Sequence, residues 1–133
     1  MSKAITFDDF RPGAVMGEAV QTYDAALSDR WRRIFGGAAS DANRAAEAAS
    51  LAVVMMMRAY LAVVTPRPPG NVHARQRLSF ASLPQPGEAV RNVISCTAKE
   101  IRRERRYVDL TVNGSGADGR PIYSATLSLI WAV

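Results

Sequence analysis

The side chains of Asp41, Asn43 and Glu47 could do chemistry together, because they lie within seven residues at the start of a predicted long helix. A carboxylate there can orient a water molecule or accept a proton. The N–H groups of a helix start stabilise an oxygen that gains negative charge. The same residues also have a structural interpretation. Asp and Asn are common helix caps, and a first-turn Glu is stabilised by the helix dipole or by an arginine. Both interpretations remain open.

A second group is positively charged and consists of Lys99, Arg102, Arg103, Arg105 and Arg106, in a chain of net charge +5. No aromatic residues interleave with this group, as stacking on a nucleic acid would require, so we expect no nucleic-acid partner. One interpretation is a solvated hairpin tip that includes Glu100 and Glu104. The other is attraction of an anionic ligand such as a nucleotide phosphate, with Arg102, Arg103 and Arg105 as its contacts.

The remaining reactive residues are isolated in the sequence. His73 is the one histidine, and we expect it on the polar face of a strand, exposed and without a catalytic role. With Cys96 as the single cysteine, no internal disulfide can form and no metal cluster is suggested. We therefore expect neither a metal nor a cofactor.

A long helix is predicted from Ala45 to Val64, because strong helix formers dominate this segment. It is apolar on most sides, so it must be covered, and a sheet that curves around it would do so. Glu47 and Arg58 are eleven residues apart and are expected on the same side of the helix. The methionines at 55–57 are either core filler or a flexible surface for an acyl chain.

Strands are predicted on both sides of this helix. Val15–Tyr23 precedes it, followed by a short helix that Ser28 caps and Gly36 ends. The strands after it are Asn71–Phe80, Glu88–Lys99, Tyr107–Asn113 and Tyr123–Trp131. Gln76 and Asn92 stand on otherwise apolar faces and are expected to be hydrogen-bonding partners in the core or site. This order predicts one α+β domain over residues 1–133, an antiparallel sheet wrapped around one long central helix.

Composition and patterning indicate a cytoplasmic protein. Residues 1–10 contain Asp8 and Asp9 and lack the apolar core of a signal peptide. The longest apolar run, Leu51–Met57, is too short to span a bilayer, so we expect no membrane partner. A sheet with one apolar face and open edges favours dimerisation through the sheet.

Several segments together resemble the MaoC-like hydratase and dehydratase branch of the hot-dog superfamily. They are Phe7–Gly13, Tyr23–Gly36, Gln76–Glu88 and Gly119–Tyr123. In that branch the motif D-x-N-P-x-H precedes the long helix. Here Asp41 and Asn43 match it, Arg44 replaces the proline, and Ala46 replaces the histidine.

The resemblance implies a ligand that is an acyl thioester of CoA or of an acyl-carrier protein. It also implies a homodimer or heterodimer, with the thioester carbonyl at the N-terminus of the long helix. Catalytic members use the Asp and His to add water to an enoyl thioester, or to remove it. Because Ala46 cannot carry a proton, three alternatives remain: a thioester-binding protein without this catalysis, a thioesterase that uses Glu47 or Asp41, and a non-catalytic subunit whose partner supplies the histidine.

Overall fold

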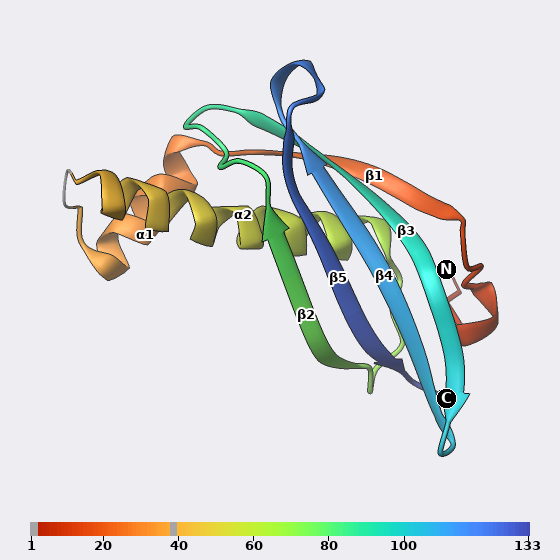
Figure 1. Cartoon of the computed structure of the whole chain (residues 1–133). Helices are drawn as coiled ribbons and strands as arrows, with labels where there is room; N and C mark the ends of the chain where they lie inside the picture. The colour runs from red at the N-terminus through yellow and green to blue at the C-terminus, as the bar shows by residue number, and fades with distance from the viewer. Residues whose placement is uncertain (1–2, 38–39) are drawn as a thin grey trace.

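The computed structural model describes residues 3–37 and 40–133. In chain order the elements are η1 (Phe7–Asp9), β1 (Val15–Thr22), α1 (Ala25–Phe35), α2 (Asp41–Val63), β2 (Val72–Phe80), β3 (Ala89–Arg102), β4 (Arg105–Ser115), η2 (Ala117–Gly119) and β5 (Pro121–Trp131). The strands form one antiparallel sheet in the order β1-β3-β4-β5-β2, so β1 and β2 are its edges. The sheet is curved, α2 lies across one face, and α1 packs beside the start of α2 (Figure 1).

The core lies between α2 and the three central strands. Buried apolar side chains from these strands include Val90, Ile94, Val108, Leu110, Val112, Leu127, Leu129 and Trp131. The buried apolar residues of α2 are Ala48, Leu51, Ala52, Met55, Met56, Ala59 and Tyr60. Their spacing of three and four residues places them on one side of the helix. Burying each large side chain contributes about 1.5–3 kcal/mol, so this interface dominates the stability of the domain.

The sheet curves over α2 as predicted and leaves the opposite stripe of the helix exposed. Val54 and Leu61 on that stripe are 36% and 44% exposed. Glu47 is buried while Arg58 is exposed, although both lie on the same side, because α1 packs beside the start of α2 and contacts Glu47 (Figure 1). As a whole α2 is long and apolar enough to cross a membrane, which the short run at 51–57 did not indicate. Core helices pass the same test, and α2 is the helix that packs on this sheet.

Both helices begin earlier than the sequence predicted. The N-cap of α1 is Asp24, whose carboxylate accepts a hydrogen bond from the Leu27 N–H at 3.0 Å. Ser28 is therefore inside the first turn, and its hydroxyl is available to another element. The N-cap of α2 is Ser40, whose Oγ accepts from the Asn43 N–H at 3.1 Å. These hydroxyl and carboxylate oxygens satisfy N–H groups that have no partner within the helix.

Two bulges change which face some residues occupy. Residues directly opposite each other in an antiparallel pair share a face. His73 is opposite the buried Leu129, so it lies on the helix side of the sheet, although exposed, and its predicted face was wrong. A strict two-residue alternation through β3 would point Ala98 inward with Ile94 and Cys96, but Ala98 is opposite Asp109 on the outer face. In each strand one extra residue interrupts the two-residue period, and the sequence does not mark that insertion.

The buried amide of Asn92 is a structural hydrogen-bonding group. Its Oδ1 accepts from the Tyr123 hydroxyl, and its Nδ2 donates to the carbonyl of Val90 at 3.2 Å. The Tyr123 ring lies over Gly114, where a Cβ would come within 2.5 Å of it. Only glycine leaves room for this ring, and the ring in turn satisfies the amide. Asn92 is thus one of the predicted core partners.

Candidate functional site

The beginnings of α1 and α2 meet around a hollow of about 200 Å³. It is lined by Trp31, Arg32, Gly36, Gly37, Asn43, Arg44 and Glu47. Two of the three residues predicted for chemistry, Asn43 and Glu47, are therefore brought together in this α1–α2 hollow. Asp41 is not among the residues that line it.

Glu47 is the centre of the hydrogen bonds that join α1 to α2. Its side chain is 4% exposed. Its carboxylate accepts from the Tyr23 hydroxyl, from Ser28 Oγ at 2.9 Å and from Arg32 Nε at 2.9 Å. Burial alone would raise the pKa of Glu47, but these three donors and the positive charge of Arg32 lower it overall. Glu47 is therefore a buried carboxylate in its ionised form, paired with an arginine.

Asp41 and Ala46 lie on the exposed side of this region. Asp41 is the first residue of α2, its side chain is 95% exposed, and it forms an ion pair with Arg44. Ala46 is exposed one residue before Glu47. The segment Asp41–Ala46 is already helical, whereas the sequence predicted that the helix begins at Ala45. This segment contains no histidine, the side chain that usually carries a proton in such catalysis.

The polar groups that the α1–α2 hollow offers are mainly hydrogen-bond donors. Trp31 Nε1 is buried and has no hydrogen-bond partner among the residues that the structure describes. Arg32 lines the hollow with a side chain that is 51% exposed. Among the residues that line the hollow, the carboxylate of Glu47 already accepts three hydrogen bonds. Such a set of groups suits an acceptor oxygen of a ligand, as in a carbonyl or a carboxylate.

Sequence reasoning missed Tyr23, Ser28 and Arg32 as members of this site. Ser28 and Arg32 are four residues apart, so they share one side of α1, and that spacing was a usable signal. No comparable signal exists for Tyr23, which directly follows β1 and reaches Glu47 through the packing of the fold.

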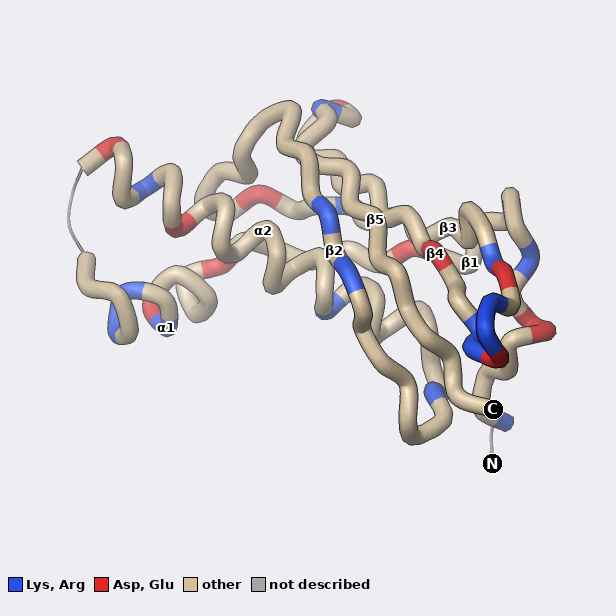
Figure 2. Tube along the Cα trace, turned by 60° about the horizontal axis from the view of Figure 1, so that its bottom comes forward, with Lys and Arg blue, Asp and Glu red and all other residues tan. Residues whose placement is uncertain are grey.

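The arginines predicted to contact a phosphate lie at the other end of the molecule. Arg102 and Arg105 end β3 and β4, and the turn between them contains Arg103, with φ of 51°, and Glu104, with φ of 66°. Figures 1 and 2 show this hairpin at the opposite end of the sheet from α1, with several basic positions gathered around it. The structure therefore does not bring the arginines together with Asn43 and Glu47.

The isolated reactive residues do not form a further centre. Cys96 is buried, and burial raises the pKa of its thiol. His73 is exposed on β2. Within residues 3–37 and 40–133, no group of three or more His, Cys, Asp or Glu side chains could hold a metal ion.

Comparison of the whole fold with solved structures identifies its class, which is the hot-dog fold. A MaoC-like dehydratase from Rhodospirillum rubrum has a TM-score of 0.71 and 16% identity, over 96% of this chain and 97% of that one. The R-hydratase PhaJ1 from Pseudomonas aeruginosa has a TM-score of 0.72 and 16% identity, over 96% and 86%.

A chain of the HadBC (3R-hydroxyacyl-ACP dehydratase) complex from Mycobacterium tuberculosis has a TM-score of 0.56 and 12% identity, over 86% of this chain and 96% of that one. No protein-family model matches the chain, and no curated protein matches it by sequence. At these identities the likeness establishes the fold. The predicted fold, and the resemblance to MaoC-like proteins as far as it concerns the fold, are confirmed.

Proposed function

We propose that this protein binds an acyl thioester, carried by CoA or by an acyl-carrier protein, with the thioester oxygen in the α1–α2 hollow. The observation that carries the proposal is the imbalance of hydrogen-bonding groups there. Trp31, which lines the hollow, has a buried Nε1 without a partner in the described residues, and Arg32, whose Nε donates to Glu47, keeps its other N–H donors at the hollow. A buried donor without a partner is costly, so an acceptor oxygen from a ligand would stabilise this arrangement.

We further propose that the chain alone does not hydrate enoyl thioesters. Ala46 occupies the position of the motif's histidine and carries no proton. Glu47 is ionised and accepts three hydrogen bonds, and its lowered pKa makes it a weak base. Removing general acid–base catalysis slows such reactions by about 10²–10⁴-fold.

A second subunit would complete the site. The α1–α2 hollow, at about 200 Å³, is smaller than the roughly 300–1,000 Å³ of small-molecule sites. Among the residues that the structure describes, β2 pairs only with β5 and is an edge of the sheet, and α2 exposes Val54 and Leu61. A chain that pairs with this edge would cover both features. HadBC, which this fold resembles, is a dehydratase complex of two kinds of chain. This favours the alternative in which a partner chain supplies the histidine.

The thioesterase alternative depends on Glu47 or Asp41. Glu47 would first have to release donors that fix its geometry, and Asp41 lies outside the hollow in an exposed ion pair. Both features make hydrolysis the less favoured proposal.

Mass spectrometry of a panel of enoyl- and acyl-CoA thioesters after incubation with the purified protein tests the proposal. We expect native spectra to contain the protein–thioester complex, and the thioesters to keep their mass. Trp31→Phe, which removes only the Nε1 donor and some ring area, should weaken binding, whereas Ser50→Ala on the exposed side of α2 should not. Gain of one water, release of CoA, or absence of any complex would each contradict the proposal.

A further inference from the structure

The β3–β4 hairpin concentrates positive charge that nearby acids only partly balance. Arg102 and Arg105 are directly opposite each other, where like charges repel. Glu100 forms an ion pair with Arg102 at 3.3 Å. Within the described residues Arg103 and Arg105 have no carboxylate partner, although Glu104 lies between them in the turn. An uncompensated group of guanidinium side chains attracts anions.

A groove begins at this hairpin and continues along the face of the sheet that is turned away from α2. Its hairpin half has a volume of about 510 Å³ and is lined by Arg102, Arg103, Arg105 and Tyr107. Its sheet half has a volume of about 630 Å³ and also contains Arg102 and Tyr107. Because the halves share two side chains, they adjoin, and we call them together the outer groove. Each half is large enough for part of a small molecule.

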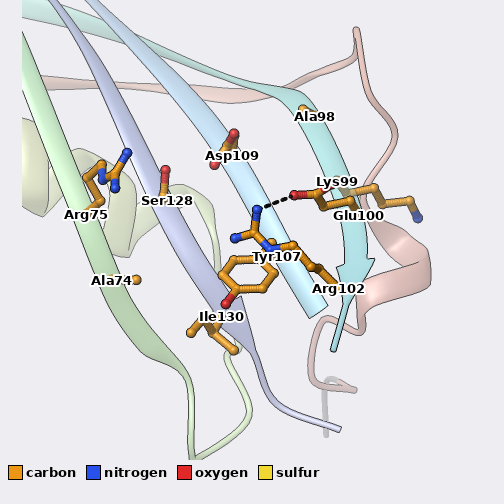
Figure 3. Close-up of a pocket in the computed structure, with 10 residues that line it drawn as sticks. All are labelled: Ala74, Arg75, Ala98, Lys99, Glu100, Arg102, Tyr107, Asp109, Ser128 and Ile130. Carbon is orange, nitrogen blue, oxygen red and sulfur yellow. Dashed lines mark ion pairs between the residues drawn. The ribbon is translucent and has the colours of Figure 1, made fainter. Parts of the chain in front are cut away.

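The sheet half presents a different set of groups in a single row. Arg75, Ser128 and Asp109 are opposite one another on β2, β5 and β4, so they share the outer face (Figure 3). Neither Arg75 nor Asp109 forms an ion pair among the described residues. Lys99 points away from this row in Figure 3, and its Nζ donates to the carbonyl of Phe7 at 3.1 Å. The row thus offers a cation, a hydroxyl and a carboxylate to a ligand.

Tyr107 lies where the two halves of the outer groove join. The guanidinium carbon of Arg102 is 4.4 Å from the centre of its ring. The pKa of the Tyr107 phenol is lowered, first by its hydrogen bond with Arg102 and then, against a smaller effect of burial, by Arg105. The same positive potential that favours a phenolate would favour a bound anion.

We propose that the outer groove binds a phosphorylated small molecule that carries hydroxyl or amino groups beside its phosphates, of the class of a nucleoside diphosphate. Arg103 and Arg105 contact the phosphates, because a guanidinium can bind two phosphate oxygens at once. Ser128 and Asp109 accept hydrogen bonds from the ligand's hydroxyl or amino groups. The Asp109 carboxylate repels phosphate from the sheet half and so orients the ligand. This site lies at the other end of the sheet from the α1–α2 hollow, and it does not depend on thioester binding.

Isothermal titration of the full chain with ADP tests the hairpin half. We expect binding that weakens as salt is added, and a loss of at least about tenfold in affinity in the double variant Arg103→Gln, Arg105→Gln. Arg77→Gln is the matched control, because Arg77 is exposed on the same face of β2 but does not line the groove. Absence of ADP binding at millimolar concentration, or equal losses in the control and the double variant, would overturn the proposal.

A comparison of ADP with inorganic pyrophosphate tests the sheet half. Asp109→Asn should weaken ADP binding and leave pyrophosphate binding unchanged or tighter, because only ADP carries donors for the carboxylate. Equal effects on the two ligands would overturn the assigned orientation. Binding of polyglutamate without ADP would overturn the small-molecule class and indicate an acidic protein partner instead.

Discussion

The α1–α2 hollow and the outer groove both contain arginines and acids, but their charges have different surroundings. In the hollow, Glu47 is buried and its carboxylate accepts hydrogen bonds from Tyr23, Ser28 and Arg32. In the groove, Arg103 and Arg105 have no carboxylate partner within the described residues. A buried charge without partners is very costly, whereas an exposed one is solvated by water.

This difference separates charge that belongs to the fold from charge that is available to a ligand. Glu47, which the sequence indicated as a candidate for chemistry, has its hydrogen-bond donors inside the domain. Arg103 and Arg105 line an open groove. The sequence alone did not decide whether these arginines form a solvated hairpin tip or an anion-binding site. The two regions should therefore respond differently when their charged residues are replaced.

The largest expected effect is on stability, in Glu47→Ala. This variant leaves the Tyr23 hydroxyl, which burial keeps from water, without its acceptor and removes the link between α1 and α2. We expect the free energy of unfolding in urea to fall by about 2–4 kcal/mol, less than for a fully buried pair because Arg32 can turn toward water.

Glu18→Ala is the matched control for this measurement. Glu18 also pairs with an arginine, Arg91, but both side chains are about half exposed. Its loss should change the free energy of unfolding by less than about 1 kcal/mol. Equal effects of the two substitutions would show that Glu47 does not join the helices as we describe.

A smaller effect on the free energy of unfolding is expected from a change of pH. Because the pKa of Glu47 is lowered in the folded state, its stabilisation is complete above its ordinary value of 4.5 and is lost as the pH falls toward the folded value. The difference in stability between the wild type and Glu47→Gln should therefore be larger at pH 7 than at pH 3. Both proteins keep Glu88, whose pKa is also lowered, so the difference isolates Glu47. A difference that does not change with pH would contradict this assignment.

Most of the fold could be predicted from the sequence, because burial on one face leaves a regular pattern. Burial on one face explains the alternation of apolar and polar residues along β4 and β5, and the apolar composition of α2. The faces of His73 and Ala98 could not be predicted, because a bulge inserts one residue without changing the type of any neighbour. The start of α1 was ambiguous for a similar reason, since Asp24 and Ser28 are both good caps and only the packing selects between them.

The candidate sites could be predicted less well, because they depend on contacts between distant segments. Glu47 was singled out, but its partners are Tyr23, which directly follows β1, and Ser28 and Arg32 of α1, and the sequence did not place these segments against α2. Arg75 and Asp109 are both opposite Ser128 of β5, and this row forms only because the strand order places β2 beside β5. The sequence left that order open.

The smallest expected effect is on the thermal stability of the hairpin. Arg105→Gln removes one of two like charges that lie directly opposite each other, so its midpoint of unfolding should stay the same or rise by about 2 °C at most in low salt. Added salt screens the repulsion, so it should raise the midpoint of the wild type more than that of the variant. ADP should reverse the order, because a bound phosphate stabilises the wild type preferentially. A clear loss of stability in the variant without ligand would mean that Arg105 belongs to the fold, as Glu47 does, and that its charge is not available to an anion.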